Sequence, residues 1–344
     1  MPSRAVWEIS ADAIVSNTKE ISRFAGKKVI AVVKANAYGH GATLLAKLLQ
    51  GLAEVSHFAV ATPEEGATLR EAAIKKPILI LGGFFEEELK LIEEYRLTPV
   101  VSDRRQLLSV IRRRIPYHLN LDTGMGRLGF TKVPYALLKL FPPEGVMTHF
   151  PTAEDREFTE RQIRRFKKLI KPLRVKFVHL QNSAGLVYKV PFANLVRVGL
   201  SLYGEYGSGG LREAGLRLTF PSRIRARILE VRRLAAGSCI SYGCRYRLKK
   251  PSWVGVISFG YADGLRRSLF KTLRVFYKGK TYPVAGNITM DLTAVDFGNT
   301  KPAVGDWVEI VNDRRKFSDI AKLLGTIPYE VMTSIGGRVE RRLV

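Results

Sequence analysis

Short apolar runs alternate with amphipathic stretches along the first two thirds of the chain. Helix-like segments at residues 63–73, 86–95, 103–113 and 154–170 lie between the apolar runs, and several begin with proline or acidic residues. Strands alternating with helices over about 200 residues predict an α/β fold, a (β/α)8 TIM-like barrel, with an open doubly wound sheet as the alternative. The eight predicted strands are residues 29–33, 57–60, 78–81, 98–101, 117–121, 146–149, 176–180 and 195–198.

The pattern changes from about Leu216 onward to strand-like runs separated by glycine and proline turns. Only residues 318–324 have the polar cap and apolar spacing of a good helix. At 344 residues the chain also exceeds what one hydrophobic core usually organises. We therefore predict two domains, a barrel over residues 1–214 and a mainly β C-terminal domain over residues 215–344. The predicted strands of the second domain are residues 223–230, 253–259, 274–277, 292–296 and 307–310.

The formal net charge of +25 suggests a polyanion partner. The basic runs, such as residues 112–114 and 164–168, are scattered, so we expect a solvated basic surface and no specific nucleic-acid partner. The chain lacks a secretory pattern at its start and an apolar stretch of roughly 18 residues, which predicts a cytoplasmic protein without membrane contact. We expect Cys239 and Cys244 to be free thiols, and no metal site.

Lys34 directly follows the first wholly apolar run and opens a loop that contains Gly39 and Gly41. Burial disfavours the ammonium form, so an amine at a strand end can become a nucleophile that forms a Schiff base. A lysine that extends from the strand end into solvent is the simpler alternative.

The ends of the predicted strands carry one chemically coherent set of side chains. A barrel places its catalytic groups at the C-terminal ends of its strands. The set holds an amine, an imidazole, hydroxyl and backbone donors and guanidinium groups, but no carboxylate cluster for a metal. These groups suit pyridoxal 5'-phosphate, which needs a lysine, phosphate donors and a partner for its ring nitrogen. They are Lys34, Tyr38, Asp122, Met125, Arg127, His149, Asn182, Ser183, Arg197 and Gly199.

Residues 32–41, Val-Val-Lys-Ala-Asn-Ala-Tyr-Gly-His-Gly, resemble the cofactor-lysine signature of bacterial alanine racemases, which are pyridoxal-phosphate enzymes of fold type III. The resemblance spans nearly the whole chain and both predicted domains. It implies two-base interconversion of L-alanine and D-alanine, which supplies D-alanine for peptidoglycan. Further family motifs follow in the family's order at residues 122–129, 148–150, 182–184, 197–204, 241–243, 260–264 and 290–291.

The resemblance also implies roles for individual residues. Lys34 would hold the cofactor through a Schiff base and act as one base, while Tyr242 would act as the base on the opposite face. Arg197 would donate to the ring nitrogen without readily protonating it, which limits transamination. The implied cofactor-binding residues are Lys34, Tyr38, His149, Asn182, Ser183, Arg197, Gly199 and Leu200, and the implied substrate-binding residues are Arg127, Met290 and Tyr261.

In the family, the equivalents of Tyr242, Tyr261, Met290 and Asp291 reach the cofactor of the other subunit, which implies a homodimer with composite active sites. We expect Asp263 and Asp291 to be structural.

Two positions depart from the family pattern. Asn120 stands where the family commonly has a carbamylated lysine, so a bound anion such as chloride would supply the missing charge. Leu343 stands where the family ending supplies a tyrosine to the phosphate, so that hydroxyl contact would be lost.

Other functions stay open at this point. A broader racemase would also accept serine or lysine, and an amino-acid decarboxylase on a related barrel would release carbon dioxide. A cofactor carrier or a nucleic-acid binder would perform no catalysis.

Overall fold

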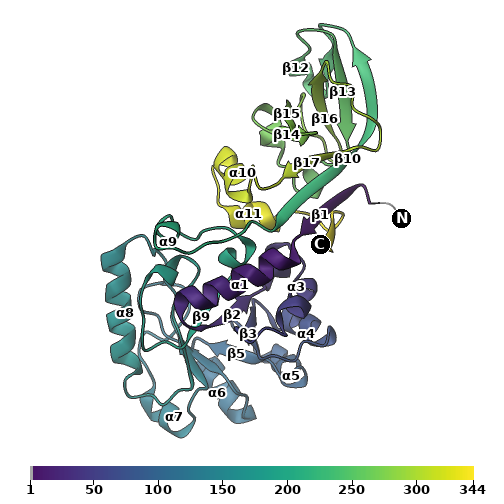
Figure 1. The fold of residues 1–344 in the computed structure, drawn as a ribbon. Coiled ribbons are helices and arrows are strands. Elements are labelled where there is room, and N and C mark those ends of the chain that lie inside the picture. Colours follow the sequence, from purple (N-terminus) through teal and green to yellow (C-terminus); the bar gives the residue numbers. More distant parts are fainter. Residues whose placement is uncertain (1–2) are drawn as a thin grey trace. The chain divides into compact units, whose positions relative to one another are not determined.

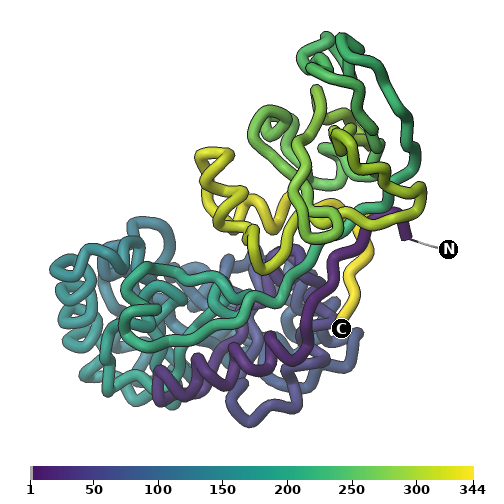
Figure 2. The backbone as a smooth tube through the Cα atoms, turned by 45° about the horizontal axis from the view of Figure 1, so that its top comes forward, coloured from purple at the N-terminus to yellow at the C-terminus, as the bar shows by residue number. Residues whose placement is uncertain are grey.

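The computed structural model describes residues 3–344, which form two compact units (Figure 1). Residues 12–219 form one unit, and residues 3–11 join residues 220–344 in the other. The first strand, β1 (Ala5–Ile9), pairs with β10 (Ser222–Leu234) and with β18 (Glu340–Leu343). The N-terminal and C-terminal strands therefore lie side by side in one sheet, as Figure 2 shows.

The first unit is a closed barrel of eight parallel strands. Its last strand pairs with its first, in the register Ile30 with Arg197 and Ala31 with Val198. This closure excludes the open sheet, and the predicted (β/α)8 barrel is confirmed. In chain order the barrel strands are β2 (Lys28–Val32), β3 (Val55–Val60), β4 (Ile78–Ile80), β5 (Thr98–Val101), β6 (His118–Asn120), β7 (Gly145–Met147), β8 (Phe177–His179) and β9 (Leu195–Val198).

Helices surround the barrel strands (Figure 1). Side chains cap three of them, because Thr62, Asp103 and Asp155 each accept a hydrogen bond from the backbone N–H three residues later. The main helices of this unit are α1 (Ala11–Ala25), α3 (Ala42–Leu49), α4 (Pro63–Glu71), α5 (Leu89–Glu94), α6 (Arg104–Arg113), α7 (Tyr135–Leu140), α8 (Arg156–Ile170) and α9 (Gly210–Glu213).

The second unit is mainly β, as predicted, and its large sheet contains β1, β10 and β18. The expectation of a single good helix there is wrong, because α11 (Pro328–Thr333) follows α10 (Phe317–Leu324). A six-residue helix is too short to produce a helical apolar period, and only its N-terminal proline marks it. The remaining strands are β11 (Cys239–Ile240), β12 (Tyr246–Arg247), β13 (Ser252–Ile257), β14 (Arg274–Tyr277), β15 (Lys280–Pro283), β16 (Thr293–Gly298) and β17 (Trp307–Val311).

The expectation of free thiols is also wrong. Cys239 and Cys244 form a disulfide, with their Cα atoms 4.9 Å apart. The hairpin of β11 and β12 brings the two residues within the Cα separation that a disulfide requires.

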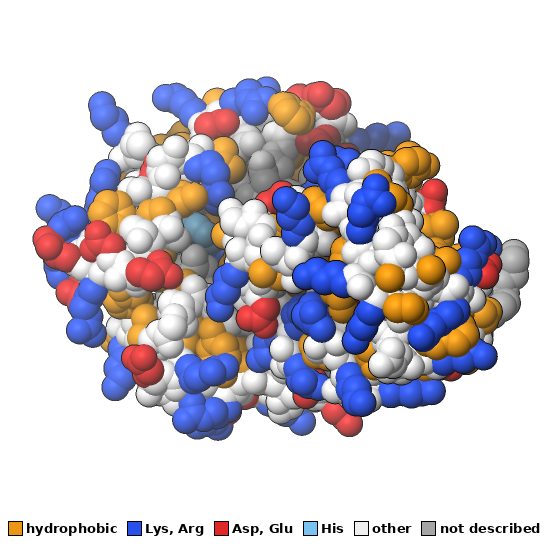
Figure 3. All heavy atoms as spheres, turned by 90° about the horizontal axis from the view of Figure 1, so that it is seen from above, with side chains coloured by type: hydrophobic (Ala, Val, Ile, Leu, Met, Phe, Trp, Pro, Cys, Tyr) orange, Lys and Arg blue, Asp and Glu red, His pale blue; other side chains and the backbone are white. Residues whose placement is uncertain are grey.

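Many basic side chains lie on the surface of the molecule. Figure 3 shows lysine and arginine side chains spread over one face, with acidic and hydrophobic side chains between them. None of the helices that residues 3–344 form is long and apolar enough to cross a membrane.

Candidate active site

The predicted barrel residues gather at the C-terminal ends of neighbouring strands. His149 follows β7, Ser183 follows β8, Arg197 lies in β9 and Lys34 follows β2. Because β7 pairs with β8, β8 with β9 and β9 with β2, these side chains lie along one arc of the barrel mouth.

The backbone directly after Lys34 forms a left-handed turn. Ala35, Asn36, Ala37 and Tyr38 have φ values of 50°, 53°, 55° and 53°. Residues other than glycine pay roughly 1–2 kcal/mol each for this conformation. No glycine or proline marks these four positions, so the sequence did not predict the turn.

Hydrogen bonds hold this turn in place. The two carboxylate oxygens of Glu65 accept from the N–H of Ala35 at 2.6 Å and from the N–H of Ala61 at 2.7 Å. The side-chain oxygen of Asn36 accepts from the N–H of Ala42 at 2.8 Å. Glu65 therefore connects the end of β3 to the residue that follows Lys34.

We expect Glu65→Gln to lower the free energy of unfolding by about 1–3 kcal/mol. An amide has one acceptor oxygen, so one of the two N–H groups would lose its partner. Urea unfolding of the apoprotein measures the change, with Glu94→Gln on α5 as the control because Glu94 is exposed. An unfolding free energy equal to that of the control would contradict this role.

Burial lowers the pKa of Lys34, and the positive charges of Arg127 and Arg197 lower it further, while Glu65 opposes them. A lower pKa raises the fraction of neutral amine, which is the form that attacks a carbonyl carbon. Arg127 is exposed in the loop after β6. The structure thus gives Lys34 the environment of a reactive amine.

Hydroxyl and backbone donors converge near Ser183. Its Oγ accepts from the N–H groups of Gly199 and Ser201, both at 3.3 Å. A Cβ atom at Gly199 would overlap the hydroxyl of Tyr38, so the absence of a side chain there lets Tyr38 approach. Leu200 begins the short helical turn η3 (Leu200–Tyr203) at this point. Such a group of donors suits a phosphate, and the residues fit pyridoxal phosphate.

Arg197 is only 3% exposed and is fixed by three acceptors. Its guanidinium donates to Nδ1 of His179 at 2.8 Å, to Nδ1 of His149 at 2.9 Å and to the carbonyl of Thr148 at 2.9 Å. Burial lowers the pKa of Arg197 to about 10, so it stays cationic at neutral pH. Since arginine only donates, both imidazoles accept through Nδ1 and carry their proton on Nε2.

His149 lies between the arginine and Asn182. The amide nitrogen of Asn182 is 3.4 Å from Nε2 of His149 and donates to the carbonyl of Phe150 at 3.1 Å. Burial, followed by the charge of Arg197, lowers the pKa of His149 to about 3. The imidazole is therefore neutral under ordinary conditions.

Two further histidines, which were not predicted, support this site. His179 ends β8, and its Nε2 lies 2.9 Å from Nδ1 of His118, which begins β6. Arg197, His179 and His118 form a continuous row inside the barrel. A histidine within a short buried strand was the available signal, because a buried polar group requires a partner.

We expect the stability of the apoprotein to fall as the pH is lowered below about 6.5, where histidines of the unfolded chain take up protons. Burial lowers the pKa of His57 to about 4 and those of His118 and His149 to about 3, and it lowers the pKa of His179 well below its ordinary value. In this pH range the folded protein therefore binds fewer protons than the unfolded chain does. The stabilisation is fully present above the pKa of histidine in the unfolded chain, and it is lost as the pH falls toward the pKa values of the folded protein. Each histidine contributes up to about 1.4 kcal/mol per pH unit.

Urea unfolding at a series of pH values between neutrality and moderate acid measures this loss. The variant His57→Gln removes one buried histidine. The slope of unfolding free energy against pH should therefore fall by the contribution of one proton. Identical slopes for the variant and the natural chain would contradict the assignment of His57.

The predicted site residues of the second domain lie together around the loop of residues 286–291. The N–H of Tyr261 donates to the carbonyl of Thr289 at 3.0 Å, and the side chain of Asn287 donates to the carbonyl of Tyr242 at 2.8 Å. Tyr242, Tyr261 and Met290 are 73%, 43% and 54% exposed. A cluster of large exposed side chains is typical of an interaction surface.

Asp263 and Asp291 share one arginine. Arg338 donates to Asp263 at 2.9 Å and to Asp291 at 2.7 Å. The other carboxylate oxygen of Asp263 accepts from the N–H of Gly260 at 2.9 Å. These contacts give both carboxylates structural partners.

The two departures from the family pattern have ordinary local packing. Asn120 is buried at the end of β6 and donates to the hydroxyl of Ser102 at 3.2 Å. Leu343 lies in β18 opposite Ile9 of β1.

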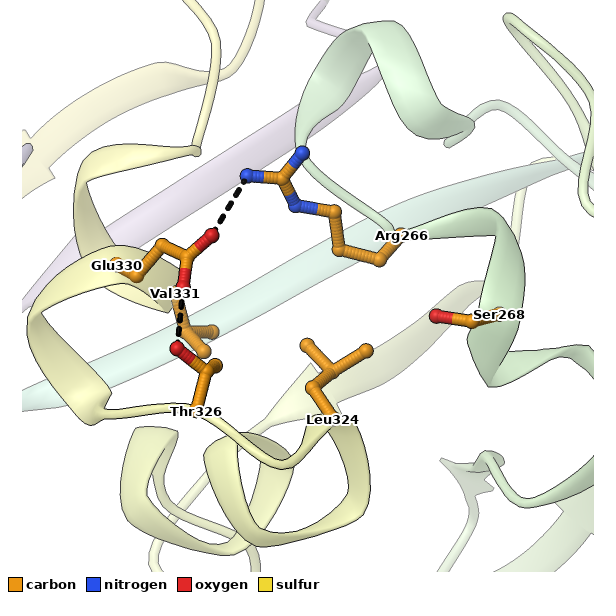
Figure 4. Close-up of a pocket in the computed structure, with 6 residues that line it drawn as sticks. All are labelled: Arg266, Ser268, Leu324, Thr326, Glu330 and Val331. Carbon is orange, nitrogen blue, oxygen red and sulfur yellow. Dashed lines mark hydrogen bonds and ion pairs between the residues drawn. The ribbon is translucent and has the colours of Figure 1, made fainter.

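A pocket of about 220 Å³ lies elsewhere, in the second domain (Figure 4). Arg266 and Glu330 form an ion pair at 3.5 Å in this pocket, and the hydroxyl of Thr326 donates to Glu330. Its charged groups are paired with each other, and no predicted site residue lines it. The barrel mouth therefore remains the candidate active site. The lining residues are Arg266, Ser268, Leu324, Thr326, Glu330 and Val331.

Known proteins match this chain over almost its whole length. Family models described as "Alanine racemase, N-terminal domain" and "Alanine racemase, C-terminal domain" match residues 9–207 and 222–343. The chain is 48% identical over 342 residues to the alanine racemase of Aquifex pyrophilus, covering 99% of this chain and 98% of that one. It is 44% identical over 342 residues to the alanine racemase of Aquifex aeolicus strain VF5, covering 99% of both chains.

Solved structures give the same result. The alanine racemase of E. faecalis superposes with a TM-score of 0.91 at 32% identity, covering 99% of this chain and 98% of that one. The alanine racemase of Bartonella henselae, solved with covalently bound pyridoxal phosphate, superposes with a TM-score of 0.88 at 28% identity, covering 100% of both chains. This chain therefore belongs to the alanine racemase family.

Proposed function

We infer that this protein is a pyridoxal-phosphate-dependent racemase that interconverts L-alanine and D-alanine. Family membership over the whole chain supports the inference. The observation that carries it is that Lys34, with its lowered pKa, follows β2, the strand that pairs with the Arg197 strand β9.

Pyridoxal phosphate, when bound, supplies an electron sink that makes the α-proton of an amino acid acidic. Lys34 would bind it covalently, and Ser183 with the N–H groups of Gly199 and Leu200 would hold its phosphate together with the Tyr38 hydroxyl. His149 and Asn182 would flank the ring.

Arg197 would donate to the ring nitrogen. The guanidinium keeps its own proton near neutral pH, and His179, His149 and Thr148 fix its position. It therefore donates a hydrogen bond without transferring a proton. A hydrogen bond without proton transfer would leave the ring of the bound cofactor a weaker electron acceptor, which would limit transamination.

Racemisation removes a proton from one face of the α-carbon and returns one to the other face, which two bases achieve directly. Lys34 would serve one face. We propose Tyr242 for the other, on the support of its family motif and its exposed phenol. Arg127 and the backbone near Met290 would bind the substrate carboxylate, with Tyr261 near the entrance.

We further propose a homodimer in which each C-terminal domain completes the site of the other subunit. The exposed cluster of Tyr242, Tyr261 and Met290 supports this arrangement, since such clusters are commonly covered by a partner. We also propose that the enzyme works in the cytoplasm and supplies D-alanine for peptidoglycan.

Parallel assays of alanine, serine and lysine test the proposed substrate. We expect fast interconversion of the alanine enantiomers and much slower turnover of the other two. Faster turnover of serine or lysine would establish the broader racemase instead, and release of carbon dioxide would establish a decarboxylase.

A further inference from the structure

The loop that carries Tyr242 is closed by the chain's disulfide. Cys239 begins β11, and Cys244 ends the helical turn η4 (Tyr242–Cys244), so the bond encloses Tyr242. The strands on either side are short. β11 and β12 pair Cys239 with Arg247 and Ile240 with Tyr246, and two further backbone hydrogen bonds join Leu248 to Gly237 and Ser238. A ladder of this length gives a hairpin little stability of its own.

The backbone of this loop is strained. Ser241 has φ 61° and ψ −178°, a conformation used almost only by glycine. Cys244 has φ 46°, and Gly243 between them has φ 72°. Such a conformation of a non-glycine residue is unfavourable, and it persists only where its surroundings fix it.

Two sets of contacts fix the loop. On one side, the hydroxyl of Ser241 donates to the carbonyl of Asn287 at 2.7 Å, and the amide of Asn287 donates to the carbonyl of Tyr242 at 2.8 Å. On the other side, the disulfide joins Cys244 to Cys239. The phenol itself is 73% exposed, so the backbone sets its direction.

We propose that the Cys239–Cys244 disulfide is a positioning element for Tyr242. It keeps the strained loop in the one conformation that aims the phenol into the partner subunit's active site, at the face of the substrate opposite the cofactor-binding lysine. The proposal rests on the proposed role of Tyr242 as the second base. Without the bond, the packing of Ile240, the hairpin's backbone hydrogen bonds and Asn287 would still hold the base of the loop, but Cys244 would lose its covalent tie to Cys239. The phenol would then sample other directions.

Two preparations of the holoenzyme remove the bond. One is the natural chain reduced with dithiothreitol, in which the disulfide gains two electrons and two protons to give two thiols while the reagent becomes its cyclic disulfide. The other is the variant Cys239→Ser/Cys244→Ser. Titration of free thiols establishes that the bond is present beforehand and absent afterwards, and the absorbance of the lysine-bound cofactor establishes that the barrel site is intact.

We expect both preparations to lose about tenfold in kcat, because a small misplacement of a catalytic group is costly. The KM for alanine and the cofactor absorbance should change little. Exchange of the α-proton in D2O should slow for one alanine enantiomer only, and amide hydrogen exchange of residues 239–247 should accelerate. Dithiothreitol should not affect the kcat of the Cys239→Ser/Cys244→Ser variant, which has no disulfide to reduce.

An unchanged kcat together with unchanged exchange from both enantiomers, in protein shown to lack the disulfide, would overturn the proposal. Two free thiols in the fully active, unreduced chain would also overturn it. The variant Tyr242→Phe separates this outcome from a failure of the proposed function. Full activity of Tyr242→Phe would refute the second base itself. An inactive Tyr242→Phe together with a fully active Cys239→Ser/Cys244→Ser variant would refute only the positioning role of the disulfide.

Discussion

Lys34→Ala is expected to abolish racemisation of alanine, with a loss of about 10⁴-fold or more in kcat/KM. The change removes the proposed covalent attachment of the cofactor and one of the two proposed bases together. The visible absorbance of lysine-bound cofactor should disappear from the purified protein, and chiral analysis of alanine measures the remaining turnover. The mouth of the barrel should otherwise be preserved, because Glu65 and Asn36 hold the following turn through its backbone and side chains.

Lys28→Ala is the matched control. Lys28 begins the same strand, β2, and is exposed there, so its removal deletes one lysine charge at the opposite end of the strand. It should keep both the absorbance and the activity. A folded Lys34→Ala variant with substantial racemisation would refute the assignment of Lys34.

Tyr242→Phe is expected to reduce kcat by about 10²–10⁴-fold, the usual contribution of a positioned acid–base group. The ring stays but the hydroxyl is lost, so only one face of the α-carbon retains a base. In D2O, the variant should still exchange the α-proton of one alanine enantiomer, while exchange from the other enantiomer and net racemisation are lost. Nuclear magnetic resonance of the two enantiomers measures both rates.

Tyr246→Phe provides the control for this variant. Tyr246 lies in the neighbouring strand β12, and its hydroxyl donates to Asp296 at 2.8 Å within the same domain. Loss of this hydroxyl should leave racemisation unchanged. Equal loss of exchange from both enantiomers in Tyr242→Phe would contradict a role confined to one face.

The barrel could be predicted because its information is local. Each strand is a short run of mostly apolar residues, and several of the following helices begin at a side-chain cap, so the alternation is visible without any long-range pairing. The site followed from the same pattern, because parallel strands bring their C-terminal ends to one mouth. Ser183 and Arg197 belong to consecutive strands of the chain, whereas Lys34 on the first strand neighbours Arg197 on the last because the barrel closes.

Other features depend on contacts between distant residues. Pairing of β1 with β10 and β18 joins both chain ends, and no local signal at residues 5–9 indicates those partners. The left-handed turn after Lys34 uses alanines and is held by Glu65 from another strand–helix unit. The row from Arg197 to His118 likewise requires the closed barrel, which brings β6 and β8 to either side of β7.

The disulfide was missed for a different reason. Two cysteines are too few for a disulfide framework, but they can form a single bond when a tight hairpin brings them together. The turn around Tyr242 brings them together, so the bond follows from local geometry that composition does not show.

The central claim is that Lys34 is the residue that binds the cofactor. Reduction of the holoenzyme with borohydride makes that bond permanent, and mass spectrometry of its peptides then locates the added pyridoxyl group. We predict a single modified peptide, with the group on Lys34. A pyridoxyl group on a different lysine, or an active holoenzyme with none, would contradict the claim.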